Sequence, residues 1–139
     1  MKIILQDNNA YILGCRRGEE VVAELKKFCA EHTIEAASFS VIGAANEVEL
    51  AWYDVHAKKY TIELLKEDLE ITTVTGDIAK LKGETVVHMH GLFSDKSMNV
   101  KGGHVNKIVV AAACEITLQK LKGTIERAYD EETGLNLMQ

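Results

Sequence analysis

Apolar residues recur at two different spacings along the chain, and the spacing separates one helix from a series of strands. Near the N-terminus a single apolar stripe follows the helical period and consists of Val21, Val22, Leu25, Phe28 and Cys29. Glu19 and Glu20 precede this stripe, where the positive end of the helix dipole favours acidic side chains. We therefore expect a helix that opens at Gly18-Glu19-Glu20 and ends near His32-Thr33, with His32 facing solvent.

Most of the remaining chain alternates between apolar and polar residues in the manner of strands. The expected strands are Lys2–Leu5, Ala10–Cys15, Ala36–Ile42, Glu47–Tyr53, Lys59–Leu65, Leu69–Gly76 continuing into Asp77–Leu81, Thr85–Phe93, Val105–Leu121 and a last one after Gly123. The sequence contains no proline, so Gly, Asn and Asp mark the turns.

Two of these strands carry more specific predictions. The small apolar run Ala36–Ile42 is typical of a strand buried on both faces, and Gly43-Ala44-Ala45-Asn46 after it predicts a bulge or a short connection. In Glu47–Tyr53, the side chains of Val48, Leu50 and Trp52 share the buried face. One helix and about eight strands in hairpin-like succession predict a single α+β domain over residues 1–139. Its sheet is expected to be mainly antiparallel and strongly curved, with the helix on one face.

Composition narrows the function classes. With 139 residues and 47% apolar residues, the chain can bury a core without disulfides, and Cys15, Cys29 and Cys114 are expected to be small buried hydrophobes. No apolar run approaches the roughly 20 residues of a membrane span, and the N-terminal apolar run is too short for a secretory signal, which favours the cytoplasm. The net charge of −5 and the dispersed basic pairs disfavour direct binding of DNA.

The strongest chemical signal lies in Glu84–His104. His88 and His90 are separated by one residue, so a strand places both on one face, with rings roughly 6–7 Å apart. Gly102-Gly103 allows the backbone to approach closely or to reverse, which would bring His104 to the same place. Three histidines predict a metal site with an open coordination position. Zinc is the default ion, and nickel, copper and iron are alternatives.

Other candidate residues have weaker support. Glu84, Ser94 and Asp95 are the nearest candidates for supporting the histidines or acting as a general base. Glu70 and Glu115 are a candidate carboxylate pair, although exposed sheet-face glutamates explain them equally well. His56 falls in a predicted turn and is expected to be exposed. The sequence contains no nucleophile elbow, no phosphate-binding loop and no dinucleotide-binding glycine motif.

Over nearly its full length the chain resembles the plants-and-prokaryotes-conserved (PPC) domain of the stand-alone prokaryotic type. The residues that carry the resemblance are Arg17-Gly18-Glu19, Gly43-Ala44, Tyr53-Asp54, Tyr60, Glu70, Gly76, His88-x-His90, Gly102-Gly103-His104, Glu115, Arg127 and Asp130–Leu135. The resemblance implies a compact α+β fold, a homotrimer and a metal held by His88, His90 and His104. Members are often labelled DNA-binding, but the AT-hook that reads DNA in the plant proteins is absent from this sequence.

Three functional hypotheses follow. The favoured one is a homotrimeric metal-binding module, with zinc or another divalent transition metal, that binds a small molecule or a protein partner in a binding or regulatory role. The alternative is a metal-dependent hydrolase or lyase that activates water at the open position, with Glu84 or a carboxylate of another subunit as base. The third is a DNA-associated assembly factor.

Overall fold

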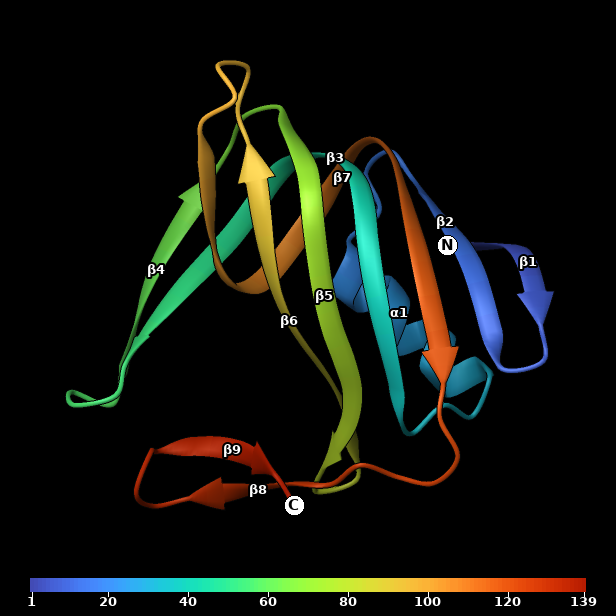
Figure 1. Ribbon diagram of the computed structural model, residues 1–139, viewed down its shortest axis with the longest axis vertical. Coiled ribbons are helices and arrows are strands. Elements are labelled where there is room, and N and C mark those ends of the chain that lie inside the picture. Colours follow the sequence, from blue (N-terminus) through green and yellow to red (C-terminus); the bar gives the residue numbers. More distant parts are fainter.

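The computed structural model describes all residues from Met1 to Gln139 and contains one helix and nine strands (Figure 1). The elements are β1 (Lys2–Asp7), β2 (Ala10–Arg16), α1 (Val21–Glu31), β3 (Ala37–Asp54), β4 (Lys59–Leu65), β5 (Leu69–Leu81), β6 (Glu84–Ser94), β7 (Val100–Lys120), β8 (Arg127–Asp130) and β9 (Leu135–Met138). The expected α+β class with one main helix is confirmed, and several strands are longer than the sequence pattern suggests.

The seven-stranded sheet is antiparallel and curls back on itself. Its order is β1-β2-β7-β6-β5-β3-β4, and β3 also pairs with β7, so that β7, β6, β5 and β3 form a closed ring. The helix lies behind the sheet in Figure 1, where Val21, Leu25, Phe28 and Cys29 face the core. Cys15 and Cys114 lie opposite each other on β2 and β7, and all three cysteines are buried free thiols. The one helix is too short and too polar to cross a membrane.

Residues 37–54 form one bent strand instead of the two that were expected. The pairing of β3 shifts register at Gly43, which has φ 141°, so the bulge interpretation of residues 43–46 is confirmed. A side chain at Gly43 would lie 2.4 Å from the Ala113 carbonyl oxygen. Glycine therefore permits both the left-handed backbone and the close approach of β7.

Two predictions about side-chain direction in β3 are wrong. Residues 37–42 are not buried on both faces, because Ser38 and Ser40 are exposed and 53% of Ile42 is exposed. Trp52 is 65% exposed, whereas Leu50 and Ala51 are both buried. Ala51, opposite His104, is the last residue of β3 that pairs with β7, whereas Trp52 pairs only with Thr61 of the edge strand β4. The side chain of Trp52 therefore lies beyond the packed part of the sheet.

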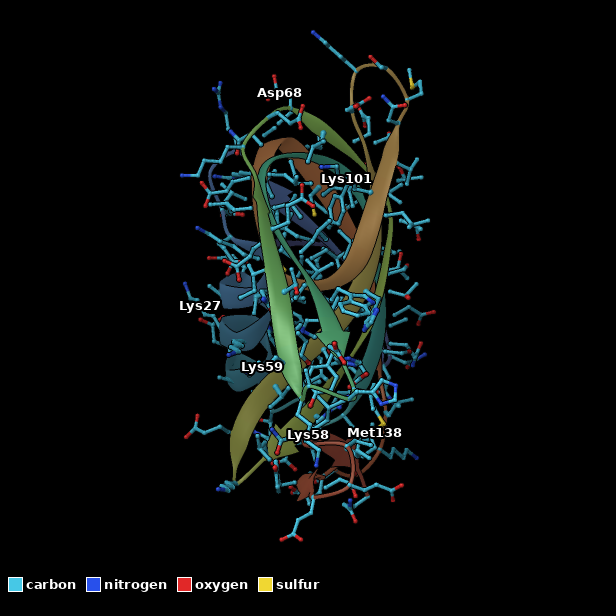
Figure 2. All side chains as sticks on the ribbon, turned by 90° about the vertical axis from the view of Figure 1, so that its left-hand side faces the viewer. Lys27, Lys58, Lys59, Asp68, Lys101 and Met138 are labelled. Atoms are coloured by element: carbon cyan, nitrogen blue, oxygen red, sulfur yellow. The ribbon has the colours of Figure 1, made fainter.

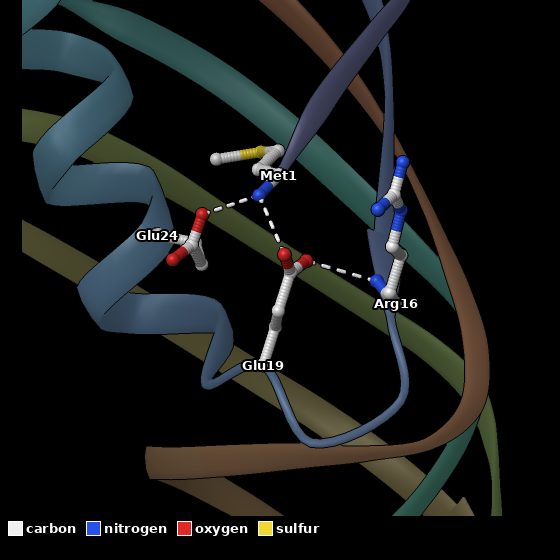
Figure 3. Close-up of polar contacts among 4 residues, drawn as sticks. All are labelled: Met1, Arg16, Glu19 and Glu24. Carbon is white, nitrogen blue, oxygen red and sulfur yellow. Dashed lines mark hydrogen bonds and ion pairs between the residues drawn. The ribbon is translucent and has the colours of Figure 1, made fainter.

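The start of α1 is held by acidic side chains, as the sequence pattern predicts. Glu20 is the N-cap, and its carboxylate accepts hydrogen bonds from the backbone N–H groups of Val22 and Ala23. Glu19 accepts from the Arg16 backbone N–H, and the Met1 ammonium donates to both Glu19 and Glu24 (Figure 3). These contacts join β1, β2 and α1 at one point.

At the other end of α1, His32 does not face solvent freely. Its ring is half-buried and packs on Phe28, with 4.3 Å between the ring centroids. The prediction of a solvent-facing His32 is therefore wrong, because Phe28 one turn earlier offers an apolar surface to the imidazole ring.

The two C-terminal strands form a separate hairpin at one end of the molecule (Figure 1). The Tyr53 hydroxyl donates to the Thr133 carbonyl oxygen at 2.7 Å, and Lys58 Nζ donates to the Glu131 carbonyl oxygen at 2.6 Å. Figure 2 shows Lys58, from the β3–β4 turn, at the same end as Met138. The β3–β4 arm and the β8–β9 hairpin thus meet, and the candidate site lies beside them.

Candidate metal centre

His104 reaches the other histidines by cross-strand pairing. β6 and β7 are antiparallel neighbours in which Ser94 is opposite Val100 and His90 is opposite His104. The chain reverses at Asp95–Asn99, so of the two alternatives for Gly102-Gly103 the reversal is wrong. The predicted close approach is confirmed, because a side chain at Gly102 would lie 2.5 Å from the Gly91 carbonyl oxygen.

The three predicted histidines meet on one surface of β6 and β7. Their ring centroids are separated by 5.2 Å for His88 and His90, and by 5.3 Å for each of these with His104. One ring nitrogen from each histidine lies within 4.8 Å of the others. His88 and His104 are half-buried and His90 is exposed, so the group is accessible from solvent.

Partial burial lowers the pKa of His90 and of His104, and the neighbouring His88 lowers both further. A lowered pKa keeps an imidazole neutral at pH 7, which is the form that binds a metal ion. The electrostatics of the site therefore favour a cation at the centre of the three rings.

The structure adds a carboxylate that the sequence interpretation missed. Asp77 Oδ2 lies 3.2 Å from His88 Nδ1, and Asp77 Oδ1 accepts a hydrogen bond of 2.8 Å from Arg127. Because a carboxylate only accepts, it holds the proton on Nδ1 and leaves Nε2 of His88 free as a ligand. Arg127 is 9% exposed and also donates to the Asn136 carbonyl oxygen, which ties β8–β9 to the site.

The sequence of the β5–β6 hairpin was sufficient to predict that Asp77 lies opposite His88. Lys82 and Gly83 form a two-residue turn with φ values of 51° and 84°, and such a turn fixes the register of its strands. With Leu81 opposite Glu84, counting along both strands places Asp77 opposite His88. Arg127 lies too far along the chain for a comparable argument.

None of the other candidates supports the histidines. Glu84 is exposed and lies four residues from His88, a distance of about 13 Å along a strand. Ser94 lies next to Thr72 at the far end of β6, and Asp95 accepts hydrogen bonds within the 95–99 turn. Glu70 and Glu115 are exposed on different strands, and no hydrogen bond or ion pair joins them. His56 is exposed in its turn, as predicted.

The donor set fits a transition metal. A zinc ion with imidazole nitrogens at about 2.0–2.1 Å separates any two of them by at most about 4.2 Å, so small ring rotations would close the site. Three neutral nitrogen donors suit zinc, copper, nickel or iron and leave a position open. His88, His90 and His104 would hold such an ion, and Asp77 would orient the first of them.

Comparison with solved structures supports this fold over nearly the whole chain. A metal-containing protein from Archaeoglobus fulgidus is 33% identical, with a TM-score of 0.90, and the match covers 100% of this chain and 99% of that one. A plant- and prokaryote-conserved protein from Pyrococcus horikoshii is 31% identical, with a TM-score of 0.88 and coverage of 94% and 90%. A Bacteroides thetaiotaomicron protein, described as a "putative dna binding protein", is 27% identical, with a TM-score of 0.93 and coverage of 97% and 94%.

No curated protein matches the sequence. The family profile of the Plants and Prokaryotes Conserved (PCC) domain matches residues 5–122, which include the helix and all three histidines. Since this match spans most of the chain and the solved relatives share its fold, the chain belongs to the Plants and Prokaryotes Conserved domain family.

Proposed function

We propose that this protein is a homotrimeric metal-binding module in which His88, His90 and His104 hold one divalent transition metal, with zinc as the default. The observation that carries the proposal is the convergence of three imidazole nitrogens within 4.8 Å from two paired strands. The metal-containing relative from Archaeoglobus fulgidus supports it. A site with an open coordination position suits a binding or regulatory role toward a small ligand or a partner.

Metal analysis tests the site directly. Protein purified without a histidine tag and dialysed against zinc is expected to retain one equivalent of metal per chain. His90→Ala should lose most of it, because two imidazoles hold zinc far more weakly than three. His56→Ala is the matched control, since His56 is an exposed histidine outside the site. Equal metal content in the wild type, His90→Ala and His56→Ala would refute the proposal.

The trimer rests on the family resemblance and on an uncovered apolar surface. Tyr60, Ile62 and Leu64 alternate along β4, share one face and are all exposed, with Ile62 58% exposed. An exposed apolar row on an edge strand is typical of a subunit contact.

The mass of the assembly in solution tests the trimer. Light scattering should give three times the chain mass of 15.4 kDa. Ile62→Glu should dissociate the trimer and Thr61→Glu, on the other face of β4, should not; a monomeric wild type would contradict the assignment.

A metal-dependent hydrolase or lyase is the second candidate, favoured by the cavity next to His88 and His104. The base proposed from sequence, Glu84, is too distant, and Asp77 is engaged by Arg127. A base would therefore come from the metal-bound water itself or from another subunit. Turnover that disappears on chelation, in a screen of esters, amides and hydroxy acids, would support this candidate.

Direct contact with duplex DNA is disfavoured by charge. The chain carries a net charge of −5, and Figure 2 places Lys27 on the helix and Lys58 and Lys59 at the end of the β3–β4 arm. Phosphate binding relies on clustered cations. We expect that this chain alone causes no salt-sensitive shift in the electrophoretic mobility of a DNA duplex. A salt-sensitive mobility shift would contradict this expectation.

A further inference from the structure

Resting on the proposed metal site, we propose that the cavity beneath the C-terminal hairpin binds a small carboxylate with a short apolar body. The carboxylate would take the open position of the metal, and the apolar body would lie against the hairpin. The inference concerns the chemical class of the ligand, for which the histidines alone give no indication.

The cavity has a volume of about 430 Å³ and lies between the histidine site and the β8–β9 hairpin. The polar residues of its lining include His88, His104, Tyr60, Arg127 and Asn136. Sites for small molecules are typically concave spaces of about 300–1,000 Å³ with a few polar groups among apolar ones. The cavity has the size and the composition of a ligand site, and two of the metal-binding histidines open onto it.

The charges around the cavity favour an anion. No acidic residue lines it, and the nearby Asp77 is paired with Arg127. Histidine ligands are neutral, so a bound divalent cation would keep its charge uncompensated by the protein. A monoanionic ligand offsets part of that charge, whereas a neutral or cationic ligand does not.

Arg127 offers a second polar contact. Two of its nitrogens are engaged by Asp77 and by the Asn136 carbonyl oxygen, but Nε is buried without any hydrogen-bond acceptor. A buried donor without a partner is costly, and native proteins usually satisfy it. Because Arg127 lines the cavity, an oxygen of a bound ligand could provide the missing acceptor after a small shift of the side chain.

About half of the residues that line the cavity are apolar. They are Leu81, Val86 and Val87 near the β5–β6 turn and Leu135 and Leu137 of β9. These side chains offer no hydrogen bonds, so they select a hydrocarbon body over a hydroxylated one. A short branched carboxylate offers a matching group to the polar and to the apolar residues of the lining.

Isothermal titration of the zinc-loaded protein tests the class. The ligand to use is 3-methylbutanoate, and 3-methylbutanamide is its neutral isostere. We expect the carboxylate to bind at least about tenfold more tightly than the amide, because it pairs with both the cation and the guanidinium. Removal of the metal should weaken carboxylate binding by a similar factor. Equal affinities for the acid and the amide would overturn the inference.

Variants locate the ligand without altering the metal ligands. Leu135→Trp fills the apolar half and should weaken 3-methylbutanoate binding about tenfold at unchanged metal content, since a filled pocket loses the apolar contacts. Leu121→Trp, at an exposed leucine outside the cavity, is the matched control and should bind normally. Unchanged binding by Leu135→Trp would place the ligand elsewhere and overturn the inference.

The metal content of the wild-type protein shows whether only the proposed ligand class is wrong or the proposed metal site as well. A wild-type protein that holds one equivalent of zinc but does not prefer the carboxylate retains the proposed metal site and loses only the ligand class. A wild-type protein that holds no metal overturns both, because the ligand class depends on the charge of the ion.

Discussion

Asp77 and His88 face each other across β5 and β6, with 3.2 Å between Asp77 Oδ2 and His88 Nδ1. The other oxygen of the same carboxylate binds Arg127, which comes from the C-terminal hairpin. One side chain therefore connects the histidine group to a segment outside the main sheet. Carboxylates in this position usually orient a histidine and raise its basicity toward a metal.

Loss of this carboxylate should weaken metal binding. Asp77→Ala is expected to lower zinc affinity by about 10–100-fold, and Asp77→Asn by less, because its amide oxygen still accepts the Nδ1 proton. Competition with a fluorescent chelator measures the change. Asp68→Ala, at an exposed acid at the opposite end of the molecule (Figure 2), should bind zinc like the wild type. Wild-type affinity in Asp77→Ala would show that Asp77 only holds the hairpin.

The candidate site was predictable from sequence to the extent that it depends on local spacing. His88 and His90 follow from the two-residue period of a strand, and a three-histidine group needed only the correct strand pairing for His104. Asp77 follows from the hairpin register but requires that the Lys82-Gly83 turn be recognised as a two-residue turn. Arg127 depends on how the C-terminal hairpin docks, which no local pattern encodes.

The fold, too, has features that local spacing predicts and features that depend on contacts between distant parts of the chain. The helix stripe and the strand positions follow from periodicity, but the exposure of Trp52 does not, because it depends on where the pairing of β3 with β7 ends, at Ala51 opposite His104. The alternation of residues 47–53 carries no signal of where a neighbouring strand ends. The exposure of Ile42 likewise depends on which face of the sheet the helix covers.

Gly103 should be intolerant of a side chain. An added Cβ would lie 2.9 Å from the Ala51 carbonyl oxygen, so Gly103→Ala would force β7 away from β3 next to His104. We expect a loss of about 1–3 kcal/mol in the free energy of unfolding, the usual cost of overpacking. Urea denaturation measures it. Gly14→Ala, whose nearest neighbour is the flexible Ile4 side chain at 3.4 Å, is the control. Equal stability of the two variants would contradict the prediction.

The Met1–Glu19 contact should make stability depend on pH in a defined way. The Arg16 backbone N–H and then the Met1 ammonium lower the pKa of Glu19 from its usual value of 4.5. A lowered folded-state pKa adds stability that is fully present above about pH 4.5 and is lost as the pH falls through the folded value.

The pKa of the Met1 ammonium shifts in the opposite direction from that of Glu19. Burial alone would lower the pKa of the Met1 ammonium, but hydrogen bonds from it to Glu24 and Glu19 raise it above 8.0. Its contribution is therefore present below about pH 8 and is lost at higher pH. The contact between the Met1 ammonium and Glu19 therefore contributes its full stabilisation of the fold between about pH 4.5 and 8.

Glu19→Gln tests this window by chemical denaturation across the pH range. Its deficit relative to wild type should reach at most about 1 kcal/mol near pH 6 and shrink toward pH 3, since the site is partly exposed. Glu31→Gln, at an exposed acid at the end of α1, should show no such trend. A deficit that is constant from pH 3 to pH 6 would contradict the assignment.

The Tyr53 hydroxyl should control how firmly the C-terminal hairpin covers the site. It donates to the Thr133 carbonyl oxygen at 2.7 Å, next to Gly134, so Tyr53→Phe leaves that oxygen without its side-chain donor and keeps the ring. The loss should fall on local opening of β8–β9, because the main sheet does not use this bond. Hydrogen exchange of the amides in residues 127–138 should accelerate severalfold, with the amides of β6 and β7 unchanged.

Tyr129→Phe is the control, because it removes a hydroxyl from a side chain that is 64% exposed on the same hairpin and should leave hydrogen exchange as in the wild type. If both variants exchange like the wild type, the hairpin is held by the Arg127 contacts, and the Tyr53 bond adds nothing to its closure.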